Sequence, residues 1–191
     1  MKQRHSNLIL IGMPGSGKST VGVILAKKTS RDFVDTDVLI QTSQQRKLQD
    51  IVDMDGHAVL RKIEEEVLLA LSTQNHVIAT GGSAVYSDQA MTHLKSDGIL
   101  IFLDVDLATL ESRIRDFSTR GIAKRPDQSL AELFDERFAI YTKHADITIK
   151  CDAMTQEQVC ERIIKEVKMF CQRNVYPLSH VGFYGLSEEM K

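Results

Sequence analysis

Short apolar runs alternate along this chain with longer segments in which apolar residues recur at helical spacing. We expect the apolar runs to form buried strands, at 8–11, 31–34, 76–80, 99–103 and 147–149. Helices are expected from residue 18 onward and over 38–53, 57–71, 107–115, 129–145 and 155–172. Strands that alternate with helices favour a parallel sheet with helices on both faces, so the pattern predicts an α/β fold.

The segment 57–71 carries a clear helical stripe. The apolar residues that recur there every four positions are Val59, Ile63, Val67 and Leu71. This spacing predicts that one side of the helix is buried. Arg61 and Glu64 lie off the stripe, so we expect them to be able to face a cleft.

The stretch 12–20, GMPGSGKST, lies between the first apolar run and the first helix, and it matches the phosphate-binding pattern G-x-x-x-x-G-K-S. Glycine lets several main-chain N–H groups point into one concavity, and the helix start adds its positive dipole end. Lys18 supplies a charge for the terminal phosphates, and the Ser19 hydroxyl is placed to bind Mg²⁺. We therefore expect a nucleoside triphosphate to contact Gly15, Ser16, Gly17, Lys18, Ser19 and Thr20.

Acidic residues and a pair of glycines follow two further strands. Asp35 and Asp37 come after the second strand, and Gly81 and Gly82 come after the third. Ligands of parallel α/β sheets bind beyond the carboxyl ends of the strands, so these residues are expected beside the phosphate loop. One carboxylate can hold Mg²⁺ through water, and the other can orient a substrate hydroxyl and take its proton. The alternative is that the acidic pair only caps the following helix.

Arginines could complement an anionic substrate. Arg61 and Arg137 could together clamp an anionic group, although each could instead form a surface ion pair. The polar and basic segment 116–128 interrupts the periodicity and is expected to be a lid. Its basic residues are candidates to close over the triphosphate, and the alternative is a solvated basic loop. They are Arg120, Lys124 and Arg125.

The composition narrows the range of partners. The chain has 191 residues, 42% of them hydrophobic, and a formal net charge of −2, so it has no basic excess for nucleic acid or a membrane surface. The first apolar run is too short for a secretory signal or a membrane span. An odd count of 3 cysteines without an export signal is typical of reduced thiols. We expect a cytoplasmic monomer that acts on a small molecule, with one domain over 1–172 and a tail over 173–191.

The order of these motifs resembles the shikimate kinases, which are small kinases built like nucleoside monophosphate kinases. The resemblance spans roughly 7–172. The matching segments are 12–20 (GMPGSGKST), 35–37 (DTD), 60–68 (LRKIEEEVL), 80–82 (TGG), 125–126 (RP) and 136–149 (ERFAIYTKHADITI). The phosphate loop alone is shared by many families, whereas the ordered set with its spacing is much more specific.

The resemblance implies a three-layer P-loop fold, with a five-stranded parallel sheet of order 2-3-1-4-5 and a mobile lid. It implies ATP-dependent phosphorylation of shikimate to shikimate 3-phosphate, a step of aromatic amino acid biosynthesis. Lys18, Asp37 and Arg125 would then be catalytic, and Ser19 with Asp35 would hold Mg²⁺. The nucleotide would also contact Arg125. The shikimate contacts would be Asp37, Arg61, Gly81, Gly82 and Arg137.

Some positions depart from the family pattern. Ser83 stands where a third glycine is usual, and Asp127-Gln128 follow Pro126 where leucines are usual. These differences leave open a related P-loop kinase that acts on another small polyol acid, such as gluconate, or on a nucleoside monophosphate.

Two other classes of nucleotide-binding protein fit less well. A regulatory GTPase needs an N/TKxD motif, and the segment 142–145, TKHA, has alanine where the aspartate should be. An ATP-driven mechanical protein needs a glutamate directly after the acid that ends its second nucleotide motif. Here Val105 follows Asp104.

Overall fold

The structure, a computed structural model, describes residues 6–114, 121–125 and 127–174. The expected lid residues 116–120 and 126, which include Arg120, lie outside this part of the chain. So does 175–191 of the expected tail.

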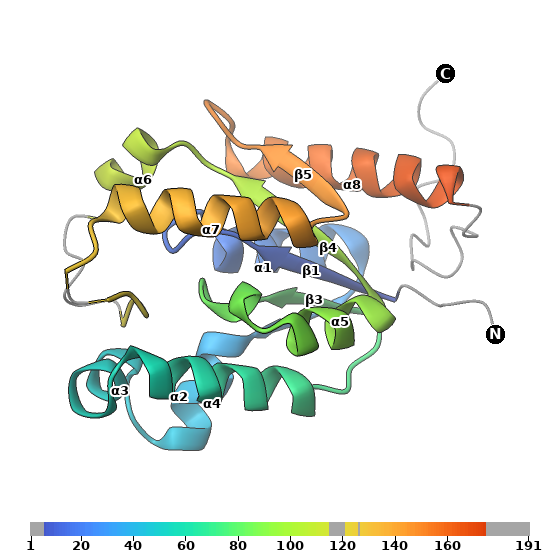
Figure 1. The fold of residues 1–191 in the computed structure, drawn as a ribbon. Coiled ribbons are helices and arrows are strands. Elements are labelled where there is room, and N and C mark those ends of the chain that lie inside the picture. The colour runs from blue at the N-terminus through green and yellow to red at the C-terminus, as the bar shows by residue number, and fades with distance from the viewer. Residues whose placement is uncertain (1–5, 115–120, 126, 175–191) are drawn as a thin grey trace.

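Five parallel strands form one sheet in the order β2-β3-β1-β4-β5, which confirms the predicted sheet (Figure 1). Their bounds are β1 (Asn7–Ile11), β2 (Asp32–Asp35), β3 (His76–Ala79), β4 (Gly98–Asp104) and β5 (Ile147–Lys150). In the central strand, Leu10 pairs with Ala79 of β3, and Ile11 pairs with Phe102 of β4. The central strands are continuous apolar runs because both faces of the sheet are covered.

Helices cover both faces of the sheet (Figure 1). Helices α1 and α8 pack together on one face, α5 and α7 lie on the other, and α2, α3 and α4 form a group beside the β2 edge. The bounds are α1 (Lys18–Thr29), α2 (Thr36–Gln44), α3 (Leu48–Asp55), α4 (His57–Ala70), α5 (Asp88–Ser96), α6 (Leu107–Arg113), α7 (Leu130–His144) and α8 (Gln156–Arg173), with the 3-10 helix η1 (Ala84–Tyr86). Capping boxes begin α7 and α8, formed by Ser129 with Glu132 and by Thr155 with Gln158.

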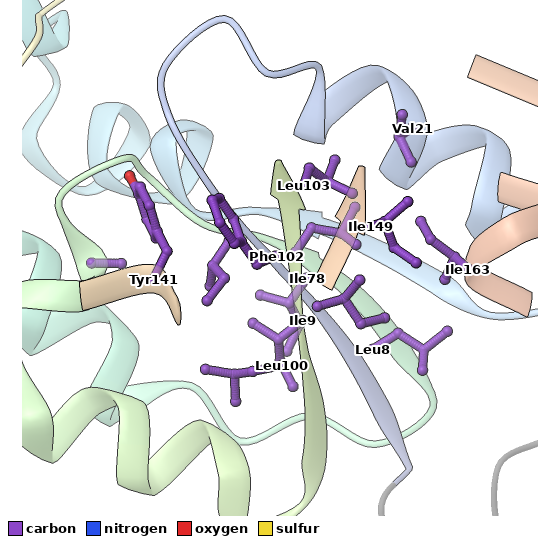
Figure 2. Close-up of a cluster of buried hydrophobic side chains, with 14 of the residues drawn as sticks. Leu8, Ile9, Val21, Ile78, Leu100, Phe102, Leu103, Tyr141, Ile149 and Ile163 are labelled. Atoms are coloured by element: carbon purple, nitrogen blue, oxygen red, sulfur yellow. The ribbon is translucent and has the colours of Figure 1, made fainter. Parts of the chain in front are cut away.

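The main hydrophobic core lies between these layers (Figure 2). Leu8 and Ile9 of β1, Phe102 of β4 and Ile163 of α8 are at most 2% exposed. The Phe102 ring stacks on Tyr141 of α7, with the two ring centroids 5.0 Å apart, so α7 is fixed against the sheet. A second, small core joins α2, α3 and α4 with one residue of the expected lid. Its buried members are Ile40, Ile51, Leu60 and Ala123.

Two helix predictions near the β2 edge were wrong in detail. The single helix expected over 38–53 is two helices, because Gln45 ends α2 in the left-handed conformation with φ of 52°. Asp50 then accepts a hydrogen bond from Lys47 N at 3.3 Å and caps the start of α3. The sequence has no glycine or proline near Gln45 that would predict the end of a helix there.

The buried side of α4 also differs from the predicted stripe. Leu60, Glu64 and Leu68 are buried, whereas Val59 is 39% exposed. Ile63, Val67 and Leu71 of the stripe are partly buried against the two cores, so the stripe is confirmed in part. The most buried line of the helix is shifted from it and includes the Glu64 carboxyl group. Helix α5 was not predicted; its segment is short and polar, and it is capped by Ser87, whose Oγ accepts from Ala90 N at 3.0 Å.

Candidate active site

The phosphate-loop segment joins β1 to α1 at the carboxyl edge of the sheet. Gly12, Gly15 and Gly17 have φ of 146°, 81° and 93°, which lie in the region that favours glycine. At Gly15 a Cβ would also lie 2.8 Å from Ile114 Cγ1, so a side chain would not fit. The chain can therefore turn tightly and begin α1 at Lys18, which places the N–H groups of the first helical turn at the loop.

A cavity of about 440 Å³, called the main cavity below, opens beside this loop. Its other walls come from α2, α3, α4, α6, α7, α8, the segment after β3 and the segment 121–123. The residues of the loop and of α1 that line it are Pro14, Gly15, Gly17, Lys18, Ser19 and Thr20. Ser16 is instead buried beneath this surface, with its Oγ 3.4 Å from Lys18 Nζ.

Lys18 is a buried cation that lines the main cavity. Its Nζ donates to the carbonyl oxygens of Gly12 at 2.8 Å and Met13 at 2.9 Å. Burial lowers the Lys18 pKa to about 8, and the carboxylate of Asp37 partly offsets this effect. The ammonium is thus held by neutral oxygens in a place where a polyphosphate would compensate its charge.

The two aspartates of the acidic pair, Asp35 and Asp37, have different positions in the structure. Asp35 caps α2, because its Oδ1 accepts from Asp37 N at 3.0 Å, and it does not line the main cavity. Asp37 does line the cavity. Burial, followed by the nearby charge of Asp35, raises the Asp37 pKa to about 6, while Lys18 acts in the opposite direction.

The segment after β3 brings two glycines to the same wall. Gly81 N donates to Thr36 Oγ1 at 3.1 Å, which ties the end of β3 to the start of α2. A Cβ on Gly81 would lie 2.8 Å from Asp37 Oδ1, and one on Gly82 would lie 2.9 Å from Arg137 Nη1. Glycine at these two positions therefore lets the charged side chains pack directly against the backbone.

Glu64 is a third carboxyl group at this wall, and it is only 3% exposed. Its Oε2 accepts a hydrogen bond from the Ser83 hydroxyl. Burial raises the Glu64 pKa to about 7, and the Ser83 hydrogen bond acts against this rise. The sequence pattern correctly excluded Glu64 from the apolar stripe but did not indicate that it is buried.

This raised pKa predicts that Glu64 makes folding stability fall as pH rises. Between the ordinary value of 4.5 and about 7, the folded chain keeps a proton that the unfolded chain has lost. We expect Glu64→Gln to become more stable relative to the parent chain by on the order of 3 kcal/mol between about pH 4.5 and about pH 7. Urea unfolding across this range measures the difference.

The matched control is Glu66→Gln, which removes the same charge from an exposed position on the same helix. Its stability difference from the parent chain should stay nearly constant over that range. A Glu64→Gln difference that is equally flat would contradict the buried, proton-retaining carboxyl group.

The two arginines meet, but they occupy different positions relative to the main cavity. Arg137 is 1% exposed, lines the cavity and donates from Nη2 to the Ala123 carbonyl at 2.6 Å. Arg61 does not line it; its guanidinium lies 3.7 Å from the ring centroid of Tyr86, and its Nη2 lies 3.5 Å from the same Ala123 oxygen. Both cations therefore converge on one carbonyl group and one aromatic ring.

Arg125 lies away from the cavity wall. It is exposed, and its Nη1 lies 3.3 Å from Glu136 Oε2. Lys124 Nζ donates to the carbonyl of Gln128 at 2.9 Å, so it too is engaged within its own segment. The described part of the expected lid contributes instead through 121–123, which forms cavity wall.

Sequence reasoning missed several residues of the site. Arg113 at the end of α6 and Gln156 at the start of α8 line the main cavity, and Tyr86 joins the two arginines. Arg113 and Gln156 follow strands β4 and β5, so the rule that ligands bind beyond strand ends could have pointed to them. Tyr86 follows β3 and falls under the same rule, although η1 carries no motif.

Two structural findings concern other kinds of site and partner. Within the described ranges, no group of three or more His, Cys, Asp or Glu side chains could hold a metal ion. None of the described helices has the length and apolar character that crossing a bilayer requires.

Comparisons with known proteins agree with this geometry. The family model for shikimate kinase matches residues 14–168. A shikimate kinase of Rippkaea orientalis is 40% identical over 165 residues, which are 84% of this chain and 85% of that protein. A solved structure of the Acinetobacter baumannii enzyme, a shikimate kinase in complex with shikimate, has a TM-score of 0.80 and 27% identity over 87% of this chain and 95% of its own. The Aquifex aeolicus shikimate kinase has a TM-score of 0.73 and 33% identity over 87% and 98%.

Proposed function

The chain belongs to the shikimate kinase family, and we propose that it transfers the terminal phosphoryl group of ATP to a hydroxyl of shikimate, giving shikimate 3-phosphate and ADP. The observation that supports this most directly is the meeting of the phosphate loop, Asp37 and Arg137 around one cavity. The phosphate loop can therefore bind the phosphates of ATP, the Asp37 carboxylate can contact a substrate hydroxyl, and the Arg137 guanidinium can pair with a substrate carboxylate. The assignment to aromatic amino acid biosynthesis follows from this reaction.

Asp37 is the residue that we assign to the substrate hydroxyl. Its carboxylate lies in the cavity, and its pKa of about 6 makes it a stronger proton acceptor than an ordinary aspartate. It can therefore take the hydroxyl proton as the oxygen bonds to phosphorus. Gly81 and Gly82, which also line the cavity, are assigned to the substrate as well.

Lys18 and the phosphate loop are assigned to the triphosphate. The Lys18 ammonium donates at present to main-chain carbonyls, and phosphate oxygens would offer it charged acceptors in a partly buried setting. Because that interaction strengthens as charge shifts during transfer, Lys18 stabilises the transition state. The left-handed glycines of the loop keep side chains out of the cradle.

Mg²⁺ fits the oxygen donors at this edge of the sheet. The Ser19 hydroxyl is exposed on the cavity wall, and Asp35 lies close enough to Lys18 and Asp37 to influence the pKa of both. Together they would hold the ion, with phosphate oxygens and water completing the shell that Mg²⁺ prefers. When bound, Mg²⁺ would neutralise negative charge on the phosphates.

Arg137 and Arg61 are assigned to the substrate carboxylate. Both now direct an N–H group at the Ala123 carbonyl, which is an oxygen acceptor without charge. A carboxylate provides two oxygens and a full charge, which suits two guanidinium groups better. For Arg125 to act on the transferring phosphate, it must leave Glu136. The monomeric state and the cytoplasmic location stay predictions.

An ADP-release assay tests the proposed function. The chain should release ADP with shikimate at least about a hundredfold faster, in kcat/KM, than with gluconate or with nucleoside monophosphates, because only shikimate fits all the assigned groups. Shikimate 3-phosphate should be the product by mass spectrometry. Preferential phosphorylation of gluconate or of a nucleotide would overturn the proposal in favour of that substrate.

A further inference from the structure

Ser83 departs from the family pattern and makes a buried side-chain contact inside the main cavity. It is 7% exposed, and its hydroxyl donates to Oε2 of Glu64, which is 3% exposed. Both residues line the cavity, one from the segment after β3 and the other from the middle of α4. A glycine at position 83 could not provide this donor.

The other oxygen of Glu64 lies toward the proposed substrate position. A Cβ on Gly81 would be only 2.0 Å from Glu64 Oε1 and 2.8 Å from Asp37 Oδ1. Two carboxylate oxygens, from α4 and from α2, therefore lie against the same side of Gly81. Since Ser83 holds Oε2, the carboxyl group cannot rotate without losing a hydrogen bond.

Arg61 does not orient the Glu64 carboxyl group, although both residues lie on α4. Its guanidinium stacks on Tyr86, and no ion pair joins it to Glu64 in the part of the chain that the structure describes. Ser83 is thus the group whose hydrogen bond orients Glu64.

We propose that Ser83 is a positioning residue: its hydroxyl fixes Glu64 so that Oε1 faces the substrate beside Asp37. This inference rests on the proposed function. A substrate with two neighbouring hydroxyls then meets two carboxylates, one for the hydroxyl that is phosphorylated and one for the hydroxyl next to it. Ser83 acts on substrate binding through Glu64 and does not touch the reacting atoms.

The charges around Glu64 indicate how the loss of Ser83 would be seen. Lys18 of α1, Asp37 of α2 and Arg137 of α7 face it, and burial raises its pKa to about 7. The Ser83 hydrogen bond favours the charged carboxylate, so removing it should raise this pKa further. The ionised form needed to accept a substrate hydroxyl would then appear only at higher pH.

The test compares Ser83→Ala and Ser83→Gly with the parent chain, using shikimate and ATP. Each variant should raise the KM for shikimate about tenfold and change kcat and the KM for ATP less than about twofold. The acidic limb of kcat/KM for shikimate should move up by about one pH unit. In a Glu64→Gln background, Ser83→Ala should shift neither the KM nor the limb, because the group that it orients has lost its charge.

Ser87→Ala is the matched control. Ser87 also donates to a glutamate, Glu65, but it lies outside the main cavity, so its loss should leave both Michaelis constants unchanged. If both Ser83 variants keep the parent KM for shikimate and the parent acidic limb of kcat/KM, the inference is overturned. It is also overturned if kcat falls by the same factor by which the KM for shikimate and the KM for ATP rise. If the parent chain does not phosphorylate shikimate, the proposed function fails first, and the two failures are thereby distinguished.

Discussion

Replacing Lys18 with methionine is expected to lower kcat by about a thousandfold or more while the fold is retained. Methionine has a similar length but no charge, so the transferring phosphate loses its buried cationic partner. The fold should survive, because Lys18 is held in the protein by uncharged oxygens and its burial carries a desolvation cost that lowers its pKa. The ADP-release assay gives kcat, and circular dichroism reports the fold.

The control for this variant is Lys27→Met. Lys27 is exposed on the same helix, so kcat should stay within about twofold of the parent value. Full activity in Lys18→Met would remove the phosphate-loop lysine from the mechanism.

Asp37→Asn is expected to lower kcat by ~10²–10⁴ with little effect on the KM for ATP. The amide has nearly the same shape as the carboxylate but cannot accept the hydroxyl proton. Asp37 lines the cavity, whereas Asp32 at the start of β2 is exposed, so Asp32→Asn provides the matched control. The measurement is kcat at saturating shikimate and ATP, and a kcat equal to that of the parent chain would exclude Asp37 as the proton acceptor.

The sheet could be predicted because its signals are local and strong. β1 and β4 are continuous apolar runs, and the capping pairs that begin α7 and α8 are three residues apart in sequence. The break at Gln45 was missed because no glycine or proline lies there. Helix α5 was missed because its buried apolar residues, Ala90, Met91 and Leu94, lie in a short and otherwise polar segment. Tertiary packing decides such elements, and it also decides which side of α4 is buried.

The site was predictable where a strand end fixes the position of a residue. Asp37 and Gly81 lie just after strands, Lys18 ends the loop that follows β1, and the structure brings all three to one cavity. The positions of Arg61 and Arg125 could not be obtained in this way. Their long side chains are placed by Tyr86 and Glu136, which lie on other elements and are fixed only by tertiary packing.

The Ala123 carbonyl has a consequence for ligand affinity. This oxygen accepts from Arg137 and lies near Arg61, so the protein already supplies an internal competitor for the two guanidinium groups. An incoming anion gains only the difference between its own hydrogen bonds and those that it displaces. Changes in the 121–123 backbone would therefore tune affinity without altering any residue that the anion contacts.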